Sequence, residues 1–198
     1  YWSVVKNGMD DAAKTLGVKA EYLAPETFDM AKMAQMIDAA AASKPDGLVV
    51  SIADPAALSE PVKNAVAAGI PVIVIDSGGG KLTKELGGLL YLGQSEYEAG
   101  VMAGERIKKL NVTKAVCANH EVGNVSLDDR CAGFAKGLGV DVPVLNGVMD
   151  PTEMKNRIIA HLKTNADTQF ILTVGIGGAE PGLMALDELG LTGKVKIG

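Results

Sequence analysis

Apolar residues recur along the chain in two patterns that alternate with one another. In one, they return every three or four positions, which predicts amphipathic helices such as residues 3–16 and 28–43. In the other, they form short continuous runs; residues 71–76, Pro-Val-Ile-Val-Ile-Asp, are the most apolar of these and are typical of a parallel strand buried on both faces. Cap residues predict further helix starts at Asp54-Pro55 and Asp150-Pro151. The other predicted helices cover 95–109, 126–138 and 179–189, and the predicted strands cover 18–23, 48–50, 71–76, 89–92, 114–118, 142–145, 170–174 and 195–197.

The alternation of strands and helices indicates an α/β fold with right-handed βαβ units and mostly parallel sheets. A break at residues 77–81, Ser-Gly-Gly-Gly-Lys, is followed by a weak strand and predicts that the chain passes from one sheet to a second. We place the boundary near residues 93–97, between an N-terminal lobe of residues 1–94 and a C-terminal lobe of residues 95–198. Because the chain opens on a helix and closes directly after a strand, we expect the fold to be truncated at both ends.

Composition and charge narrow the classes of partner. The hydrophobic fraction of 47% supplies a core, while an aromatic fraction of 4% and 24 glycines suit helices packed closely on a sheet. The formal net charge is −5, and the sequence has no basic patch of the kind expected for nucleic-acid binding. No apolar run approaches the length of about 18 residues that a membrane-spanning helix needs. These features favour a small neutral molecule or another protein as the partner.

The two cysteines, Cys117 and Cys131, allow several chemistries. A zinc site is disfavoured, because this spacing with only His120 and His161 as further ligands matches no zinc pattern. Cys117 lies near the end of an apolar run and Cys131 lies early in the next predicted helix, so the two could approach each other. A disulfide and a pair of free core thiols both stay open at this point, and a disulfide would fit an oxidising compartment.

Ligands of open parallel sheets bind beyond the carboxyl ends of the strands, so the residues that follow the apolar runs are the first candidates. Asp76 ends the most apolar strand, where a carboxylate needs hydrogen-bond donors to offset its desolvation. We interpret Asp76 as an acceptor for ligand hydroxyls, with the capping of a loop amide as the alternative. Ser51 ends the preceding strand, and its hydroxyl either binds a ligand or satisfies only the local backbone.

Guanidinium and aromatic side chains add three candidates. Arg130 lies early in a predicted helix and can hold two oxygens with its planar fork, although a surface salt bridge to Asp128 or Asp129 explains it equally well. Tyr1 and Trp2 are adjacent aromatics whose rings can stack on the apolar face of a sugar. The alternative is that one of the two rings packs against the first helix.

Enzymatic motifs are weak in this chain. Residues 78–82 lack the spaced first glycine and the Ser/Thr of a P-loop. Residues 175–180 follow a predicted strand and open a helix, as a dinucleotide-binding turn does, but Glu180 stands where the third glycine belongs. The sequence also lacks a nucleophile elbow and a His-Glu-x-x-His motif. We therefore predict no catalytic residues, no cofactor and no metal site, with a dinucleotide-dependent enzyme as an alternative.

Four segments, in this order and at this spacing, resemble ribose-type periplasmic binding proteins of ABC transporters, which belong to the type I periplasmic-binding-protein family. They are residues 1–13, 70–76, 93–100 and 130–134. The likeness extends along essentially the whole chain. It implies two doubly wound parallel-sheet lobes joined by crossing segments, with a sugar in the cleft between them. Ser77 departs from the family pattern, which often has arginine after the acid, so the resemblance does not specify ribose.

The resemblance also implies a set of ligand-binding residues. They are Tyr1, Trp2, Ser51, Asp76, Gln94 and Arg130. In the family pattern, Tyr1 and Trp2 match an aromatic pair that stacks on the sugar, and Asp76 matches the acid that receives its hydroxyls. Ser51 matches a polar position at the end of a strand, and Gln94 matches a polar position at the lobe crossover.

By this resemblance, the protein captures a small neutral monosaccharide or polyol and delivers it to the membrane permease of an ABC-type importer. Hinge closure would bring Arg130 from the second lobe onto ligand hydroxyls. We expect a monomer in the periplasm or another extracytoplasmic compartment, although the chain begins at Tyr1-Trp2 without a methionine or a visible signal peptide. The alternative with the same fold is the effector-binding core of a lactose-repressor-like transcription regulator, which an upstream helix-turn-helix would identify.

Overall fold

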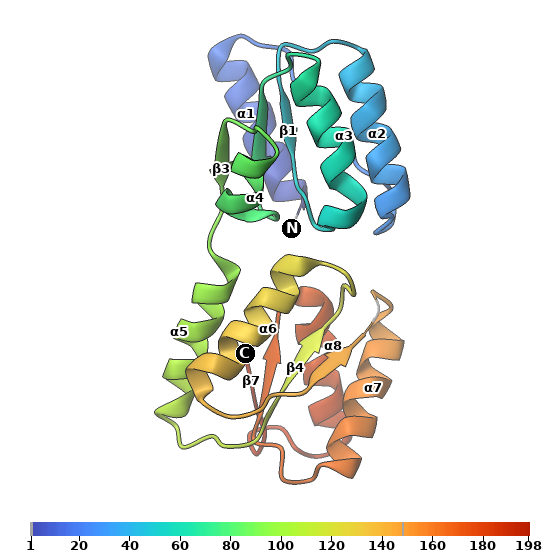
Figure 1. Ribbon diagram of the computed structural model, residues 1–198. Coiled ribbons are helices and arrows are strands. Elements are labelled where there is room, and N and C mark those ends of the chain that lie inside the picture. Colours follow the sequence, from blue (N-terminus) through green and yellow to red (C-terminus); the bar gives the residue numbers. More distant parts are fainter. Residues whose placement is uncertain (1, 148) are drawn as a thin grey trace.

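The computed structural model describes residues 2–147 and 149–198, which form two parallel α/β units stacked end to end (Figure 1). The first unit contains α1 (Trp2–Leu16), α2 (Met30–Ala42), β1 (Leu48–Val50), α3 (Pro55–Ala67), β2 (Val72–Ile75), α4 (Gly79–Glu85) and β3 (Leu90–Leu92). The second unit contains α5 (Glu96–Lys108), β4 (Ala115–Asn119), α6 (Val125–Leu138), β5 (Val144–Asn146), α7 (Pro151–Thr164), β6 (Phe170–Thr173), α8 (Ile176–Glu188) and β7 (Lys196–Ile197). A short segment between β3 and α5 joins the two units along one side (Figure 1).

The strands pair in parallel in both sheets. The first sheet has the strand order β1-β2-β3, and the second has the order β5-β4-β6-β7. In the first sheet Val74 lies opposite both Val50 and Tyr91, so the carboxyl ends of neighbouring strands fall at one edge. In the second, Ala118 lies opposite Leu145 in the same way. This architecture confirms the predicted α/β fold class with parallel sheets.

Helices cover the second sheet on both faces. On one face, Phe134 of α6 and Phe170 of β6 stack with their ring centroids 5.6 Å apart. On the other face, Met154 and Ile158 of α7 are fully buried in a cluster with Ile171 of β6. The central strand β4 is buried at every position, which explains the continuous apolar run at residues 115–118.

The first sheet is covered mainly on one face, by α2 and α3. Val72 and Val74 of β2 lie there in a core with Leu58 of α3. Side chains alternate across a strand, and the alternate positions are open: Val49 of β1 is 62% exposed and Leu92 of β3 is 55% exposed. Helix α1 likewise has no buried residue. Within the part of the chain that the structure describes, the second face of this sheet therefore carries little cover.

Cap residues fix where the helices begin. The side chains of Asp54 and Asp150 accept hydrogen bonds from first-turn amides of α3 and α7, and a proline follows each cap. Ser95 and Asn124 cap α5 and α6 in the same way. Each such cap contributes about 1 kcal/mol to helix stability. The two helix starts predicted from Asp-Pro pairs are therefore confirmed.

Two local predictions are wrong. Residues 18–23 form mostly exposed coil instead of a strand, and no described strand pairs with them to supply the hydrogen bonds that a strand needs. The break at residues 77–81 does not end the first sheet. Gly78 and Gly79 adopt positive φ angles of 114° and 71°, which suit glycine, and start the short helix α4. The chain then returns through β3, which pairs with β2 in the same sheet.

Candidate ligand-binding site

The carboxyl edges of the two sheets face each other. Val125 at the start of α6 donates its backbone N–H to the carbonyl oxygen of Ala53 at 3.0 Å. Ala53 lies just beyond the carboxyl end of β1, and α6 follows the loop at the carboxyl end of β4. Figure 1 shows the same relation, with one end of α6 reaching up towards the first unit. Because ligands of parallel sheets bind at these edges, the candidate site lies where the two units meet.

Asp76 follows β2 in a left-handed backbone conformation with a φ of 61°. This conformation costs a non-glycine residue about 1–2 kcal/mol, and Asn and Asp tolerate it best. The Asp76 carboxylate accepts hydrogen bonds from the Ser51 hydroxyl at 3.4 Å and from the Ser77 hydroxyl at 3.2 Å. Both serines are buried. The structure thus brings the two predicted residues Ser51 and Asp76 together and fixes the orientation of the carboxylate.

Tyr91 of β3 connects Asp76 with the crossover between the units. Its hydroxyl donates to the carbonyl oxygens of Asp76 at 2.7 Å and of Gln94 at 3.1 Å. Burial raises the pKa of the Tyr91 hydroxyl above 10.0, and the Asp76 and Glu96 carboxylates raise it further, so the hydroxyl stays protonated as a donor. A Cβ on Gly93 would lie 2.3 Å from the Tyr91 oxygen, which explains the glycine there. Tyr91 was not among the predicted site residues, because an aromatic residue inside a short strand is ordinarily explained by packing.

Arg130 of α6 forms an ion pair with Glu96, the first residue of α5. Its Nε donates to Glu96 Oε2, Nη2 forms an ion pair with the same oxygen, and Nη1 donates to the carbonyl oxygen of Val174 at 3.3 Å. The other carboxylate oxygen of Glu96 accepts a hydrogen bond from the Gln94 amide at 2.8 Å. The Glu96 side chain is 11% exposed and the Arg130 side chain is 26% exposed. Two predicted residues, Gln94 and Arg130, are therefore brought together through a third that sequence analysis did not name.

The expected salt-bridge partners of Arg130, Asp128 and Asp129, are thus replaced by Glu96, which lies 34 positions away in the sequence. An acidic residue one position after the helix cap Ser95 is ordinarily explained by the helix dipole, so Glu96 gave no separate signal. The ion pair depends on the packing of α5 against α6, and this packing cannot be predicted from the residues next to Glu96 or Arg130 in the sequence.

The aromatic pair at the N-terminus is described only in part. Tyr1 lies outside the described residues. Trp2 begins α1 and is 40% exposed. Figure 1 shows this end of α1 on the side of the first unit that faces the second, which is the side of the candidate site.

The loop after β4 forms its own polar network. Asn119 is fully buried; its amide donates to the Asp128 carboxylate at 2.8 Å, and its side-chain oxygen accepts from the Glu121 backbone N–H at 2.9 Å. Asn124 donates to the Glu121 carboxylate at 2.8 Å. Because these groups satisfy one another, the loop forms a firm support beside Arg130 rather than a set of open ligand contacts.

The ring of His120 packs against the glycine turn at residues 175–178. A Cβ on Gly177 would lie 2.5 Å from the His120 ring, and one on Gly175 would lie 2.8 Å from it. The His120 ring is buried, and its Nδ1 has no hydrogen-bond partner among the described residues. Burial lowers the pKa of His120 below 6.5 against the opposing effect of Glu121, so the ring is neutral near pH 7. These glycines make room for the imidazole, which removes the main support for a dinucleotide-binding turn.

Cys117 of β4 and Cys131 of α6 form a disulfide. Both are buried in the core between the second sheet and α6. Cys131 directly follows Arg130, so the disulfide fixes this turn of α6 on the sheet.

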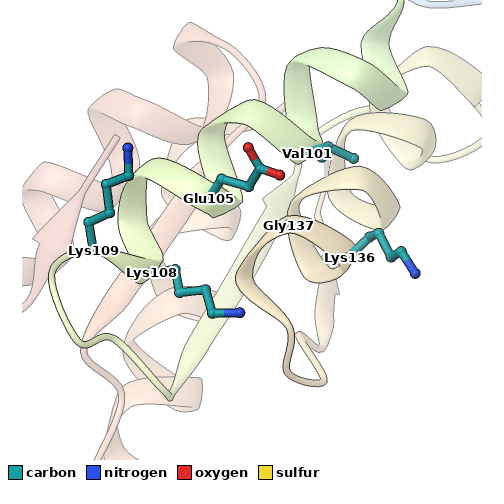
Figure 2. A pocket seen from close by; sticks show the side chains of 6 residues that line it. All are labelled: Val101, Glu105, Lys108, Lys109, Lys136 and Gly137. Carbon is teal, nitrogen blue, oxygen red and sulfur yellow. The ribbon is translucent and has the colours of Figure 1, made fainter.

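Other surface features lie away from these residues. The hollow in Figure 2 lies on α5 and α6 and is lined by Val101, Glu105, Lys108, Lys109, Lys136 and Gly137. A second hollow lies beside β5 and α7. Within residues 2–147 and 149–198, no group of three or more His, Cys, Asp or Glu side chains could hold a metal ion. In the same residues, no helix has the length and apolar character needed to cross a membrane.

Two parallel units whose carboxyl edges face each other, each contributing charged and polar groups, define a two-lobed binding protein. The chain belongs to the periplasmic binding protein family, since the model of the periplasmic binding protein domain matches residues 1–198. The predicted resemblance is therefore confirmed. Over 109 residues the chain is 32% identical to the xylose/arabinose-binding protein XylF of Sulfolobus acidocaldarius; the match covers 52% of this chain and 27% of that protein.

Solved structures agree with this assignment. A carbohydrate transporter from Acidothermus cellulolyticus, solved in complex with myo-inositol, is 32% identical with a TM-score of 0.90, covering 99% of this chain and 67% of that one. A periplasmic sugar binding protein of an ABC sugar transporter from Legionella pneumophila is 25% identical with a TM-score of 0.90, covering 100% of this chain and 75% of that one. The fold and family thus extend along the full sequence.

Proposed function

We propose that this chain binds a small neutral sugar or polyol between lobes 1–94 and 95–198 and presents it to the permease of an ABC importer. The observation that carries the proposal is Asp76, held in a left-handed conformation at the carboxyl edge of its sheet and oriented by two buried serine hydroxyls. A carboxylate fixed in this way is an acceptor for ligand hydroxyls. The sugars and the polyol named with the relatives support the same class of ligand.

Arg130 supplies the second half of the proposed site. Glu96 engages Nε and Nη2 and Val174 engages Nη1, which leaves a further N–H on each Nη for ligand oxygens. A ligand held by Asp76 on one unit and Arg130 on the other binds the closed arrangement more tightly than an open one. Only such differential affinity shifts a conformational equilibrium towards closure. The role of Trp2 and Tyr1 would be to stack on the apolar face of the sugar.

Several consequences belong to the same proposal. Solute binding requires no chemistry on the ligand, so the protein is not an enzyme and needs no cofactor. It would act outside the cytoplasm as a monomer, and the closed form would be the form that the permease recognises. The regulator alternative is not favoured, because the relatives are named for sugar binding and transport.

The test is isothermal titration calorimetry with D-xylose, L-arabinose, D-glucose, D-galactose and myo-inositol. At least one of these ligands should bind the wild-type protein, and Asp76→Asn should weaken that binding by about tenfold or more, since it removes a charged acceptor. Asp38→Asn on the exposed surface of α2 is the matched control and should bind as the wild type does. Binding of none of the five, or equal binding by Asp76→Asn, contradicts the proposal.

A further inference from the structure

The charge of Arg130 is already compensated within its own unit. Two of its N–H groups converge on one oxygen of Glu96, and the Gln94 amide holds the other oxygen of that carboxylate. Glu96 is more buried than Arg130, with 11% of its side chain exposed against 26%. Both residues lie on helices of the second unit, so the pair does not depend on closure of the two units.

Other carboxylates lie near this pair. Asp128 and Asp129 precede Arg130 on α6. Burial raises the pKa of the Asp129 carboxyl, and the negative charges of Asp128 and Glu96 raise it further. The negative charges of Asp76 and Glu96 both raise the pKa of the Tyr91 hydroxyl. The carboxylates named here outnumber the one guanidinium, and an excess of negative charge repels anionic ligands.

Hydrogen bonding remains open to Arg130 even though its charge is paired. Two of its N–H groups have no acceptor among the described residues. These donors can reach hydroxyl oxygens of a neutral ligand at little electrostatic cost. A ligand carboxylate, in contrast, would have to compete with Glu96 for the guanidinium and would approach that carboxylate closely.

We propose that Glu96 is a specificity-determining residue that makes this site select neutral sugars over sugar acids by neutralising Arg130. This inference rests on the proposed function. It adds a role for Glu96 and the expectation that the site excludes sugar acids. Removing the charge of Glu96 without changing its size should free Arg130 to pair with a carboxylate on the ligand. Glu96→Gln is the required change, since its amide oxygen can still accept a hydrogen bond from Arg130.

The experiment measures dissociation constants of the five neutral ligands named above and of D-glucuronate and D-galacturonate, for the full chain. The measured quantity is the ratio between the tightest neutral ligand and the tighter acid. The wild type should prefer the neutral ligand by about a hundredfold or more, and Glu96→Gln should reduce this ratio by about tenfold, an electrostatic change of about 1.4 kcal/mol. The acid binding that Glu96→Gln gains should also weaken as NaCl rises from about 0.02 to 0.3 M, because salt screens a new ion pair.

Two control variants separate charge from structure. Glu98→Gln removes an exposed acid from the same first turn of α5 and should leave the ratio unchanged. Glu96→Asp keeps the charge and should keep the preference for neutral ligands, even where the shorter side chain weakens all binding. Circular dichroism verifies that each variant is folded.

The possible failures are distinguishable. If a neutral sugar binds but the wild type binds either acid equally well, the exclusion rule is wrong while the proposed function stands. The same conclusion follows if folded Glu96→Gln keeps the wild-type ratio. If none of the neutral ligands binds the folded wild-type protein, both the proposed function and this inference are overturned.

Discussion

Helices α5 and α6 cross with their backbones in close contact, and this crossing makes a sharp prediction for Gly133→Ala. A Cβ on Gly133 would lie 2.0 Å from the carbonyl oxygen of Tyr97 and 3.1 Å from the backbone nitrogen of Val101. Real Cβ atoms stay at least 3.0 Å from such atoms, so the backbones must separate. Because the obstacle is backbone, no side-chain rotation can relieve it.

The cost follows from two opposing effects. Overpacking of a tight interface costs about 1–3 kcal/mol or more, and separation of the helices by about 1 Å places Gly133→Ala at the upper end. The higher helix propensity of alanine offsets about 1 kcal/mol of this cost. We therefore expect a net loss of about 2 kcal/mol and a fall in Tm of about 4–8 °C.

Thermal and urea unfolding followed by circular dichroism measure this loss. Gly8→Ala is the matched control, because it lies inside α1 with nothing within 4 Å of the added Cβ. It should leave the unfolding free energy unchanged or raise it by up to about 1 kcal/mol. Equal stability of Gly133→Ala and Gly8→Ala would refute the reasoning from helix approach.

Three other predictions concern the disulfide, the backbone at Asp76 and the histidines. Replacing Cys117 and Cys131 together by alanine should lower the unfolding free energy by about 3 kcal/mol, given a separation of 14 residues, and dithiothreitol should destabilise only the wild type. Asp76→Gly should be more stable than Asp76→Ala by about 1 kcal/mol in urea, because only glycine adopts a φ of 61° without strain; equal stability would argue against the left-handed conformation. Burial lowers the pKa of His120 and of His161 below 6.5, so the unfolded state binds protons that the folded state does not, and stability should fall as the pH drops below 6.5. His120→Gln should lose less stability than the wild type between about pH 7.5 and 5.5 in urea titrations, and an identical pH dependence would contradict this assignment.

Features with a local physical cause could be predicted from the sequence. The Asp-Pro pairs begin α3 and α7, because a cap side chain acts within one turn of the helix. The apolar run of β4 predicts a buried strand, since both of its faces are covered. Ser51 and Asp76 could be placed together at the carboxyl edge of the first sheet, because neighbouring parallel strands end at the same edge.

Features that depend on a distant neighbour could not be predicted in this way. Residues 18–23 alternate like a strand, but alternation does not supply a pairing partner. The glycines at residues 78–80 read as an interruption, whereas the positive φ angles of Gly78 and Gly79 let the chain turn tightly into α4. The Glu96–Arg130 pair joins two helices across 34 positions, and neither residue identifies the other locally.

A signal for that pair was nevertheless present in the spacing of the glycines. Gly100 and Gly104 lie four positions apart on α5, as Gly133 and Gly137 do on α6. An added Cβ at any of the four would lie 2.0–2.3 Å from the nearest backbone atom of the other helix. Small residues at this spacing line one face of a helix and permit backbone contact. The Cβ position of Gly100 lies 2.3 Å from the carbonyl oxygen of Arg130, and Glu96 lies one turn before Gly100 on the same face of α5. The close approach of α5 and α6, which requires glycine at these positions, therefore also places Glu96 within reach of Arg130. The helix packing and the charge balance of the proposed site have this one cause.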